Sequence, residues 1–351
     1  SGFNLLKRLT SNRWISIPAA FLYAISPVAV AAVSTGHIAT LLMLMIAPFV
    51  ALLLHDWWGI EKYSWRKIFS ISLLFALLYA FTLMSFVIAL VASIAVALDN
   101  FEQYSLHKDK ELFKEQLLKR AALVFIPFFV NAPYSLEAIL HPSRFLTEPG
   151  LLIPGGGPFA VLLGNPGGSG SLPLWLVSPI LLVLAVSLFS STHARQIAEY
   201  GIGFLILAVL IGSLSISSHG NESTAKAWAG PVLSLVTLAS VASATVMLDK
   251  LRSTLVLSHI HYRHILSALL LFVTVVYALL TIGHSVGSGA NSLVQANRST
   301  VMPAFLSVES DTKILVLREV GSAKEKKIQY YISRGDDISL GEPDVAPEQN
   351  Q

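Results

Sequence analysis

The sequence predicts an all-α polytopic membrane protein of about eight transmembrane helices with a small α+β tail. Of its residues, 54% are hydrophobic and only 13% are charged. The mean hydropathy is +0.66, and long apolar segments recur with almost no charge inside them. Soluble globular chains do not have this composition. We therefore expect a multi-spanning domain over residues 1–283 and a small extramembrane domain over residues 284–351.

Charge and cysteine content exclude several classes of protein. The formal net charge is +3, with basic residues scattered among the loops, so the sequence gives no support for nucleic-acid binding. No cysteine is present, which excludes disulfides and thiolate metal sites. His259, His261 and His264 have a spacing that could suit a metal, but no carboxylate completes the set nearby. We therefore predict neither a metal site nor a cofactor.

The apolar segments define the expected spans in chain order. The first two are separated by only three residues, so they form either a tight hairpin or a re-entrant pair. A span needs roughly 17 to 25 residues, and several segments are near the lower limit. The eight expected spans cover residues 15–34, 38–54, 68–98, 121–140, 174–189, 202–217, 227–248 and 265–282.

The third expected span is a run of 31 residues without a charged side chain. Residues 68–98 hold no charged side chain, and one helix of that length measures about 46 Å. Because the hydrocarbon core is roughly 30 Å thick, such a helix must tilt or project. The charged segment that follows is expected to contain a basic amphipathic helix over residues 108–120, suited either to solvent or to an anionic lipid surface.

Orientation does not follow from the loops alone. Counted on alternating sides of eight spans, the loops hold eight Lys and Arg on one face and nine on the other. The positive-inside rule therefore does not determine the orientation of the chain in the membrane. We favour a cytoplasmic position for the basic helix 108–120, which places the central loop and the tail outside.

The tail is polar and carries one structural pattern. Residues 313–319 and 327–333 alternate in the manner of strands and are separated by a Gly-Ser turn, so they predict a β-hairpin. A single hairpin is marginal by itself and should dock on another surface. The last residues are expected to be disordered.

The central loop over residues 141–173 is the stretch around which the chain is organised. It holds eight Gly and six Pro in 33 residues, and we expect this density to exclude helix and strand. Long irregular loops inside compact domains are usually functional or disordered. The apolar content of this loop favours packing on the domain or on the bilayer surface.

Four polar residues of the loop are candidates for contact with a substrate or a lipid phosphate: His141, Arg144, Glu148 and Asn165. The arginine could hold a phosphate group and the glutamate could act as a base. The alternative is an ordinary pair of charges at the membrane interface. The Gly run is not a phosphate-binding P-loop, because no Gly-Lys-Ser/Thr follows it.

Asp56 and Glu61 follow the second span and are expected on the same face as the central loop. A glycosyltransferase that works in the membrane needs a carboxylate near the interface to take the proton of the acceptor hydroxyl. These two residues are the candidate catalytic groups. The alternative is that they are charges of the membrane boundary without a catalytic role.

Several segments together resemble one family. These are AFLYAISPVAVAAVSTGHIATLLMLMIAPFVALLL (20–54), HPSRFLTEPG (141–150), GNPGGSGSLPLWL (164–176), AWAGP (227–231), MPAFL (302–306), ILVLRE (314–319) and YYISRGDDISLGEPDV (330–345). They resemble the C-terminal multi-spanning membrane region of large actinobacterial family 2 glycosyltransferases. The chain departs from that pattern at Gly36-His37, where the family usually has Gly-Arg.

The resemblance implies a soluble nucleotide-sugar-binding domain upstream and a polyprenyl-linked glycan as partner. No Asp-x-Asp motif occurs in the chain, so the implied catalytic domain lies outside it and no catalytic residue is carried over. We expect a membrane-embedded part of a cell-envelope glycosyltransferase in a bacterial plasma membrane, which anchors the enzyme and handles a lipid-linked acceptor or product. Two alternatives stay open: a non-enzymatic subunit of a polysaccharide assembly or export complex, and a membrane glycosyltransferase that uses a polyprenyl-phosphate sugar.

Overall fold

The computed structural model divides the chain into two compact units, residues 1–216 with 225–290 and residues 217–224 with 291–351. The first is called the helical unit below. The structure describes residues 2–10, 12–54, 60–107, 110–146, 148, 155–168, 171–217, 224–256, 276–277, 279–287, 313–322 and 325–334.

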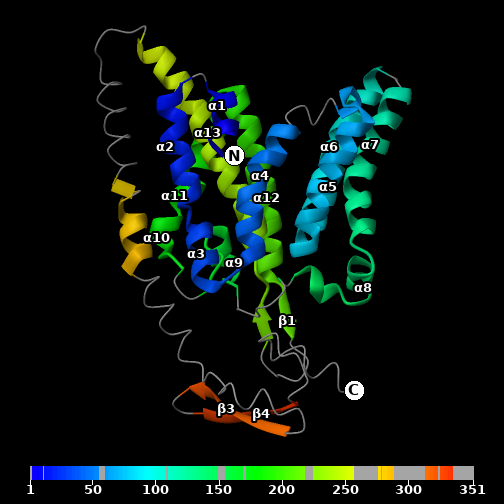
Figure 1. Ribbon diagram of the computed structural model, residues 1–351. Coiled ribbons are helices and arrows are strands. Elements are labelled where there is room, and N and C mark those ends of the chain that lie inside the picture. The colour runs from blue at the N-terminus through cyan, green and yellow to red at the C-terminus, as the bar shows by residue number, and fades with distance from the viewer. Residues whose placement is uncertain are drawn as a thin grey trace. The chain divides into compact units, whose positions relative to one another are not determined.

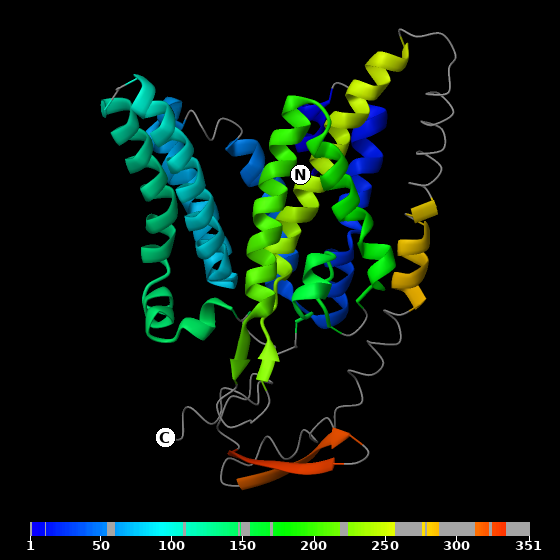
Figure 2. The same cartoon turned by 180° about the vertical axis from the view of Figure 1, so that it is seen from behind.

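The helical unit is built from α-helices of very different length (Figure 1). Helices α4 and α12 both pack against α13, and α5, α6 and α7 form a second group (Figure 2). The helices are α1 (Gly2–Leu9), α2 (Arg13–Ala24), α3 (Pro27–Thr35), α4 (Ile38–Leu53), α5 (Trp65–Phe81), α6 (Met84–His107), α7 (Lys110–Val130), α8 (Tyr134–Leu140), α9 (Pro158–Leu162), α10 (Leu174–Val177), α11 (Pro179–Leu188), α12 (Thr192–Ser213) and α13 (Gly230–Val256), with the short 3₁₀ turns η1 (Ile60–Lys62) and η2 (Pro142–Phe145).

Three helical stretches among the described residues are long and apolar enough to cross a membrane: Arg13–Thr35, Thr192–Ser213 and Gly230–Arg252. Counting the bent pair Glu111–Val130 and Tyr134–Leu140 as one broken span raises the number to four. Shorter apolar helices cover Ile38–Leu53, Met84–Leu98 and Leu174–Leu188. The chain therefore has the helices of a membrane protein, whereas the number of about eight spans stays a prediction.

Large apolar side chains cover the outside of these helices. Met45, Leu73 and Leu182 are each about two-thirds exposed, although they belong to three different helices. Exposed apolar surface of this extent is costly in water and is normal against lipid tails. The exterior of the helical unit is thus consistent with a bilayer environment.

The uncharged run 68–98 does not form one helix, so that expectation is wrong. Helix α5 ends at Phe81, Thr82 is extended (φ −149°, ψ 113°), and α6 begins at Met84. The Thr82 carbonyl accepts a hydrogen bond from the Ser85 N–H (3.1 Å), which helps to begin the new helix. At 1.5 Å per residue, α5 and the apolar part of α6 measure roughly 26 and 23 Å, closer to the thickness of a bilayer core than one helix of about 46 Å.

Two further helices differ from the sequence prediction at their starts. The described part of the basic segment, residues 110–120, is continuous with the apolar residues after it, because both belong to α7. Helix α12 begins at Thr192, ten residues before the predicted start at 202. Ser191 caps it by accepting from the Ala194 N–H (3.5 Å), and an Arg195–Glu199 ion pair (2.8 Å) supports its first turns.

Two strand pairs complete the described structure. Strands β1 (Ser215–Ser217) and β2 (Thr224–Lys226) form a two-stranded sheet between α12 and α13. Strands β3 (Lys313–Ser322) and β4 (Glu325–Arg334) pair antiparallel in the second unit, with Lys313 opposite Arg334. An independent α+β tail domain stays a prediction, and the final residues lie outside the described part.

Small residues and interhelical hydrogen bonds hold the helices together, as is usual when no hydrophobic effect drives helix association in lipid. The Ser187 hydroxyl on α11 donates to the Ser243 hydroxyl on α13 (3.2 Å), and the Tyr23 hydroxyl on α2 donates to the Leu44 carbonyl on α4 (2.8 Å). Gly201 on α12 faces both α11 and α13. A Cβ atom there would lie 2.8 Å from Leu184 Cδ2 and 2.9 Å from Ala239 Cβ.

Gly201 and Gly203 on α12 provide a matched test of this packing. Gly201→Ala should lower the free energy of unfolding by about 1–3 kcal/mol, because its methyl group overpacks the contact with α11 and α13. Gly203→Ala meets no atom within 4 Å, so it should be neutral or stabilise by up to about 1 kcal/mol through helix propensity. Thermal unfolding in detergent compares the two variants, and equal midpoints would contradict the packing.

Candidate functional site

The central loop leaves the second helix group and reaches the first. After α8 the turn η2 carries Phe145 toward the core, where its ring centroid lies 6.1 Å from that of Phe86. Three residues later, Glu148 is buried at 8% exposure. The loop is therefore anchored on both helix groups of the helical unit.

Glu148 lies at the centre of a buried polar cluster. One carboxylate oxygen, Oε2, is 3.1 Å from Nδ1 of His37, and the other accepts a hydrogen bond from the Thr40 hydroxyl. The Trp228 indole N–H donates to Thr40 Oγ1 at 2.9 Å, and the Trp228 ring stacks on His37 at 3.7 Å between centroids and 15° between planes. All four side chains are buried. These four residues are called the Glu148 cluster below.

A sharp turn between α3 and α4 places His37 in this cluster. Gly36 ends α3 in the left-handed region at φ 78°, and the His37 N–H bonds back to the Ala32 carbonyl at 2.9 Å. This is a Schellman arrangement, which glycine adopts without steric cost. His37 is then the N-cap of α4, but its side chain makes no capping bond and turns to Glu148 instead. Thr40 follows three residues later on the same helix face.

Trp228 comes from the short segment before α13. The ring fits over the start of that helix because residue 230 is glycine: a Cβ atom there would collide with Trp228 Nε1 and lie 2.7 Å from Thr40 Oγ1. The cluster therefore joins three regions that are far apart in the sequence, at the beginning of α4, before α13 and in the central loop.

The hydrogen-bond directions follow from the chemistry of the groups. An indole nitrogen only donates, so Thr40 Oγ1 accepts from Trp228 and its own proton goes to Glu148. A carboxylate only accepts, so Nδ1 of His37 carries the proton and donates to the second carboxylate oxygen. Nε2 of His37 is buried and has no hydrogen-bond partner in the described structure. Glutamate and histidine can move protons, but both oxygens of Glu148 are engaged, so the arrangement favours fastening of the loop over open acid–base chemistry.

The glycine-rich part of the loop is ordered, which corrects the expectation that it excludes helix and strand. Gly155 and Gly167 form an antiparallel bridge, and the Gly156 N–H donates to the Pro166 carbonyl at 2.6 Å. A Cβ atom at Gly167 (φ 92°) would collide with the Gly156 nitrogen, so the close approach requires glycine. Between the two glycine segments, residues 158–162 form α9, with Pro158 at the first helical turn where proline is tolerated.

Asn165 fastens the loop to itself. Its Oδ1 accepts from the Gly167 N–H and its Nδ2 donates to the Leu172 carbonyl, both at 2.8 Å. The loop also bonds to the strand before α13, because the Gly155 N–H donates to the Lys226 carbonyl at 2.9 Å. Asn165 thus has a structural role in this loop, and its contact with a substrate or lipid stays a prediction.

Of the other predicted site residues, those that the structure describes lie outside the Glu148 cluster. His141 is exposed at the end of α8. Arg144 lies in η2, but its side chain is not described. Glu61 belongs to η1, which follows the other end of α4 and contacts α7, so the expectation that it shares a face with the central loop is wrong. Asp56 lies outside the described residues.

Sequence reasoning missed His37, Thr40 and Trp228. Each stands in an apolar stretch with no polar partner nearby in the sequence, and the pairs are 111, 108 and 188 positions apart. The available signals were a lone histidine in the turn between two apolar segments and a tryptophan just before a Gly-Pro pair.

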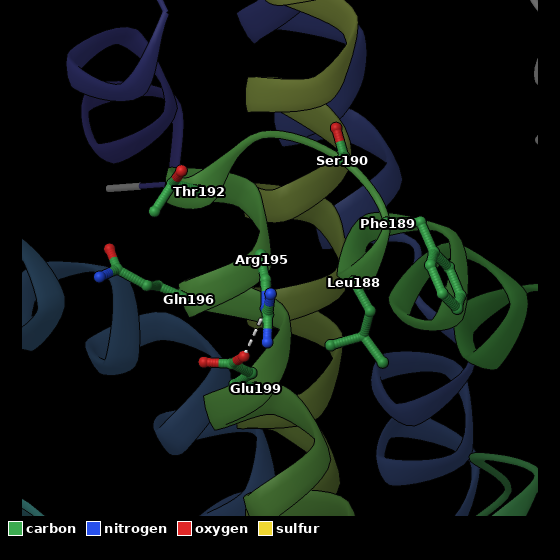
Figure 3. Close-up of a pocket in the computed structure, with 7 residues that line it drawn as sticks. All are labelled: Leu188, Phe189, Ser190, Thr192, Arg195, Gln196 and Glu199. Carbon is green, nitrogen blue, oxygen red and sulfur yellow. Dashed lines mark hydrogen bonds and ion pairs between the residues drawn. The ribbon is translucent and has the colours of Figure 1, made fainter.

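A surface pocket of about 520 Å³ lies elsewhere, around the turn between α11 and α12 (Figure 3). Its lining residues are Leu188, Phe189, Ser190, Thr192, Arg195, Gln196 and Glu199. The pocket is open, its charged residues form an exposed i,i+4 ion pair, and it holds none of the predicted site residues. We therefore place the candidate site at the Glu148 cluster instead.

No family model, curated protein or solved structure matches this chain. The described residues also contain no group of three or more His, Asp or Glu that could hold a metal ion. His259, His261 and His264 lie outside the described residues.

The Glu148 cluster can be tested through stability. Glu148→Ala leaves Thr40 and His37 buried without their acceptor, so the free energy of unfolding should fall by about 1–3 kcal/mol. Glu199→Ala removes an exposed carboxylate from a surface pair and should cost less than about 1 kcal/mol.

Thermal unfolding of both variants in detergent gives the comparison, and a double-mutant cycle with His37→Ala assigns the effect. His37 and Glu148 should be coupled, whereas His37→Ala and Glu199→Ala should add. Additive effects of His37→Ala and Glu148→Ala would show that the two side chains do not interact.

Proposed function

We propose that this chain is the membrane-embedded part of a glycosyltransferase of cell-envelope glycan synthesis in a bacterial plasma membrane. In this proposal the helices anchor the enzyme, and the central loop binds a polyprenyl-linked acceptor or the growing glycan. The catalytic nucleotide-sugar domain belongs to a region upstream. The glycosyltransferase family in this proposal comes from the resemblance of the sequence segments described above.

The observation that carries the proposal is the way in which the central loop is held. A linker without function would not need a buried carboxylate, yet Glu148 ties the loop to His37 and Thr40 at the start of α4. The bonds from Gly155 to Lys226 and from Asn165 to Leu172 fix the rest of the described loop. A fixed Gly/Pro-rich surface at the ends of apolar helices suits a ligand with a lipid tail and a polar head.

A non-enzymatic subunit of an export or assembly complex is the first alternative, since the same helices and loop would also serve a scaffold. The second is a membrane glycosyltransferase with Asp56 or Glu61 as base and a polyprenyl-phosphate sugar as donor. Glu61 follows Ile60, which is fully buried and packs with Ile68 and Leu123, so the backbone at Glu61 is held in place. Because a catalytic base must be held in position, this buried support favours keeping the membrane glycosyltransferase as an alternative.

Detaching the loop should abolish function without affecting insertion. In cells whose envelope glycan depends on this chain, Glu148→Ala should reduce the glycan strongly, and deletion of 141–173 should abolish it. Both variants should still fractionate with the membrane, because the helices supply the apolar surface for insertion. Glu199→Ala serves as the control with normal glycan, and Glu148→Gln keeps the shape of the side chain if the alanine variant is degraded. Normal glycan in the inserted deletion variant would overturn the proposal.

The second alternative has its own test. If the membrane domain is catalytic, Asp56→Asn or Glu61→Gln should remove transfer from a polyprenyl-phosphate sugar, because an amide cannot accept the acceptor's proton. Transfer is measured with purified membranes and a radiolabelled lipid-linked sugar. Under our main proposal both variants keep full glycan synthesis in cells. Loss of lipid-linked transfer in either variant, with normal insertion, would instead favour a catalytic membrane domain.

A further inference from the structure

Most lysine and arginine residues of the described helical unit lie at one end of its helices. Helices α4 and α13 begin at the Glu148 cluster, which marks the loop end of the unit, and they run toward the opposite end (Figure 1). That opposite end is called the basic end below. It carries Lys7, Arg8, Arg13, Lys62, Arg66, Lys67, Lys110, Lys114, Arg195, Lys250 and Arg252, all near the ends of α1, α2, α5, α7, α12 and α13 or in η1. Lys119 and Arg120 lie in the middle of α7 and are buried.

Only Arg144 and Lys226 of the described helical unit lie at the loop end. This asymmetry is hidden when residues 68–98 are read as one span. Because α5 and α6 run as two helices joined at Thr82, the chain returns to the side from which it came. The segments before and after residues 68–98 then lie at the same end of the helical unit. The basic residues before α5 and those at the start of α7 are therefore counted at the same end.

Aromatic contacts mark the level of the boundary at the basic end. Lys67 Nζ lies 3.4 Å from the ring centroid of Tyr63, and Lys119 Nζ lies 5.9 Å from that of Trp65. Trp14, at the start of α2, is 83% exposed. Tryptophan and tyrosine beside lysine and arginine are typical of the interface between a bilayer and water.

We infer that the basic end of the helical unit lies on the anionic lipid surface of the cytoplasmic leaflet, so that the Glu148 cluster and the central loop face the opposite side of the membrane. Lys and Arg near the ends of spans set orientation by the positive-inside rule. Each basic residue near an anionic surface contributes about 1 kcal/mol, so eleven at the basic end against two at the loop end is a large bias.

This orientation limits the ligands that the central loop can bind. The argument rests on the function proposed above. A nucleotide sugar carries several charges and does not cross a bilayer core unaided. A sugar that the central loop binds on the far side must therefore arrive on a lipid carrier. A polyprenyl-linked saccharide, with its phosphate near the headgroups, has this chemistry.

The absence of cysteine from the chain allows a clean test by thiol labelling in intact cells. Ser143→Cys places a thiol on the exposed turn η2 at the loop end, and Gln196→Cys places one on the exposed face of α12 at the basic end. Both variants should react with a maleimide in detergent. A membrane-impermeant maleimide added to intact cells should label only Ser143→Cys, and Gln196→Cys should react only after permeabilisation.

Labelling of Gln196→Cys in intact cells, alone or together with Ser143→Cys, would overturn the inference. Neutralising the charges provides a second measurement: replacing Lys62, Arg66, Lys67 and Lys114 by Gln should raise the fraction of Gln196→Cys labelled from outside. An unchanged labelling pattern in this variant would argue against the basic residues as the cause of the orientation. Labelling requires no glycan synthesis, so a wrong orientation and a wrong function are distinguished.

Discussion

The structure of the central loop depends on one constraint: a buried carboxylate must find donors for both of its oxygens. Glu148 finds them in His37 and Thr40 on α4, at sequence separations of 111 and 108. To bring these donors there, α3 must end at Gly36 in a left-handed turn and α4 must begin at His37. Trp228 then completes the set from the start of α13, where Gly230 leaves room for its ring. A glycine turn, a helix start and a loop are thus specified together by one buried group.

Specific contacts also explain why residues 155–168 of the loop have a defined structure despite their composition. Glycine at 167 permits a backbone approach that a side chain would block, and the hydrogen bonds of Asn165 replace those that a strand or helix would supply. Composition alone suggested that no regular structure survives there. What composition cannot show is which glycines lie opposite each other, because that is set by the closure of the chain between Gly155 and Gly167.

The helical class and the membrane-like helices could be predicted because apolar content is a local property that composition reports. The reversal at Thr82 could not, since neither Gly nor Pro nor a charge marks it. Of the candidate site residues, Glu148 was found because a charge in an apolar loop is conspicuous. His37 and Trp228 were missed because each needs the fold to acquire its partner. Distant pairing is a property of packing, and a single sequence does not record it.

The reversal at Thr82 also has an effect far from Thr82. Loops of a polytopic chain are assigned alternately to the two sides of the membrane. One missed turn therefore reverses the side assigned to every later loop, and the Lys and Arg counts for the two sides become wrong. With the turn in place, Lys62, Arg66 and Lys67 before α5 fall on the same side as the basic half of α7. The near balance of eight against nine Lys and Arg residues therefore resulted from treating residues 68–98 as one span. Charge patterning in this chain becomes informative only when helix breaks that carry no sequence mark are known.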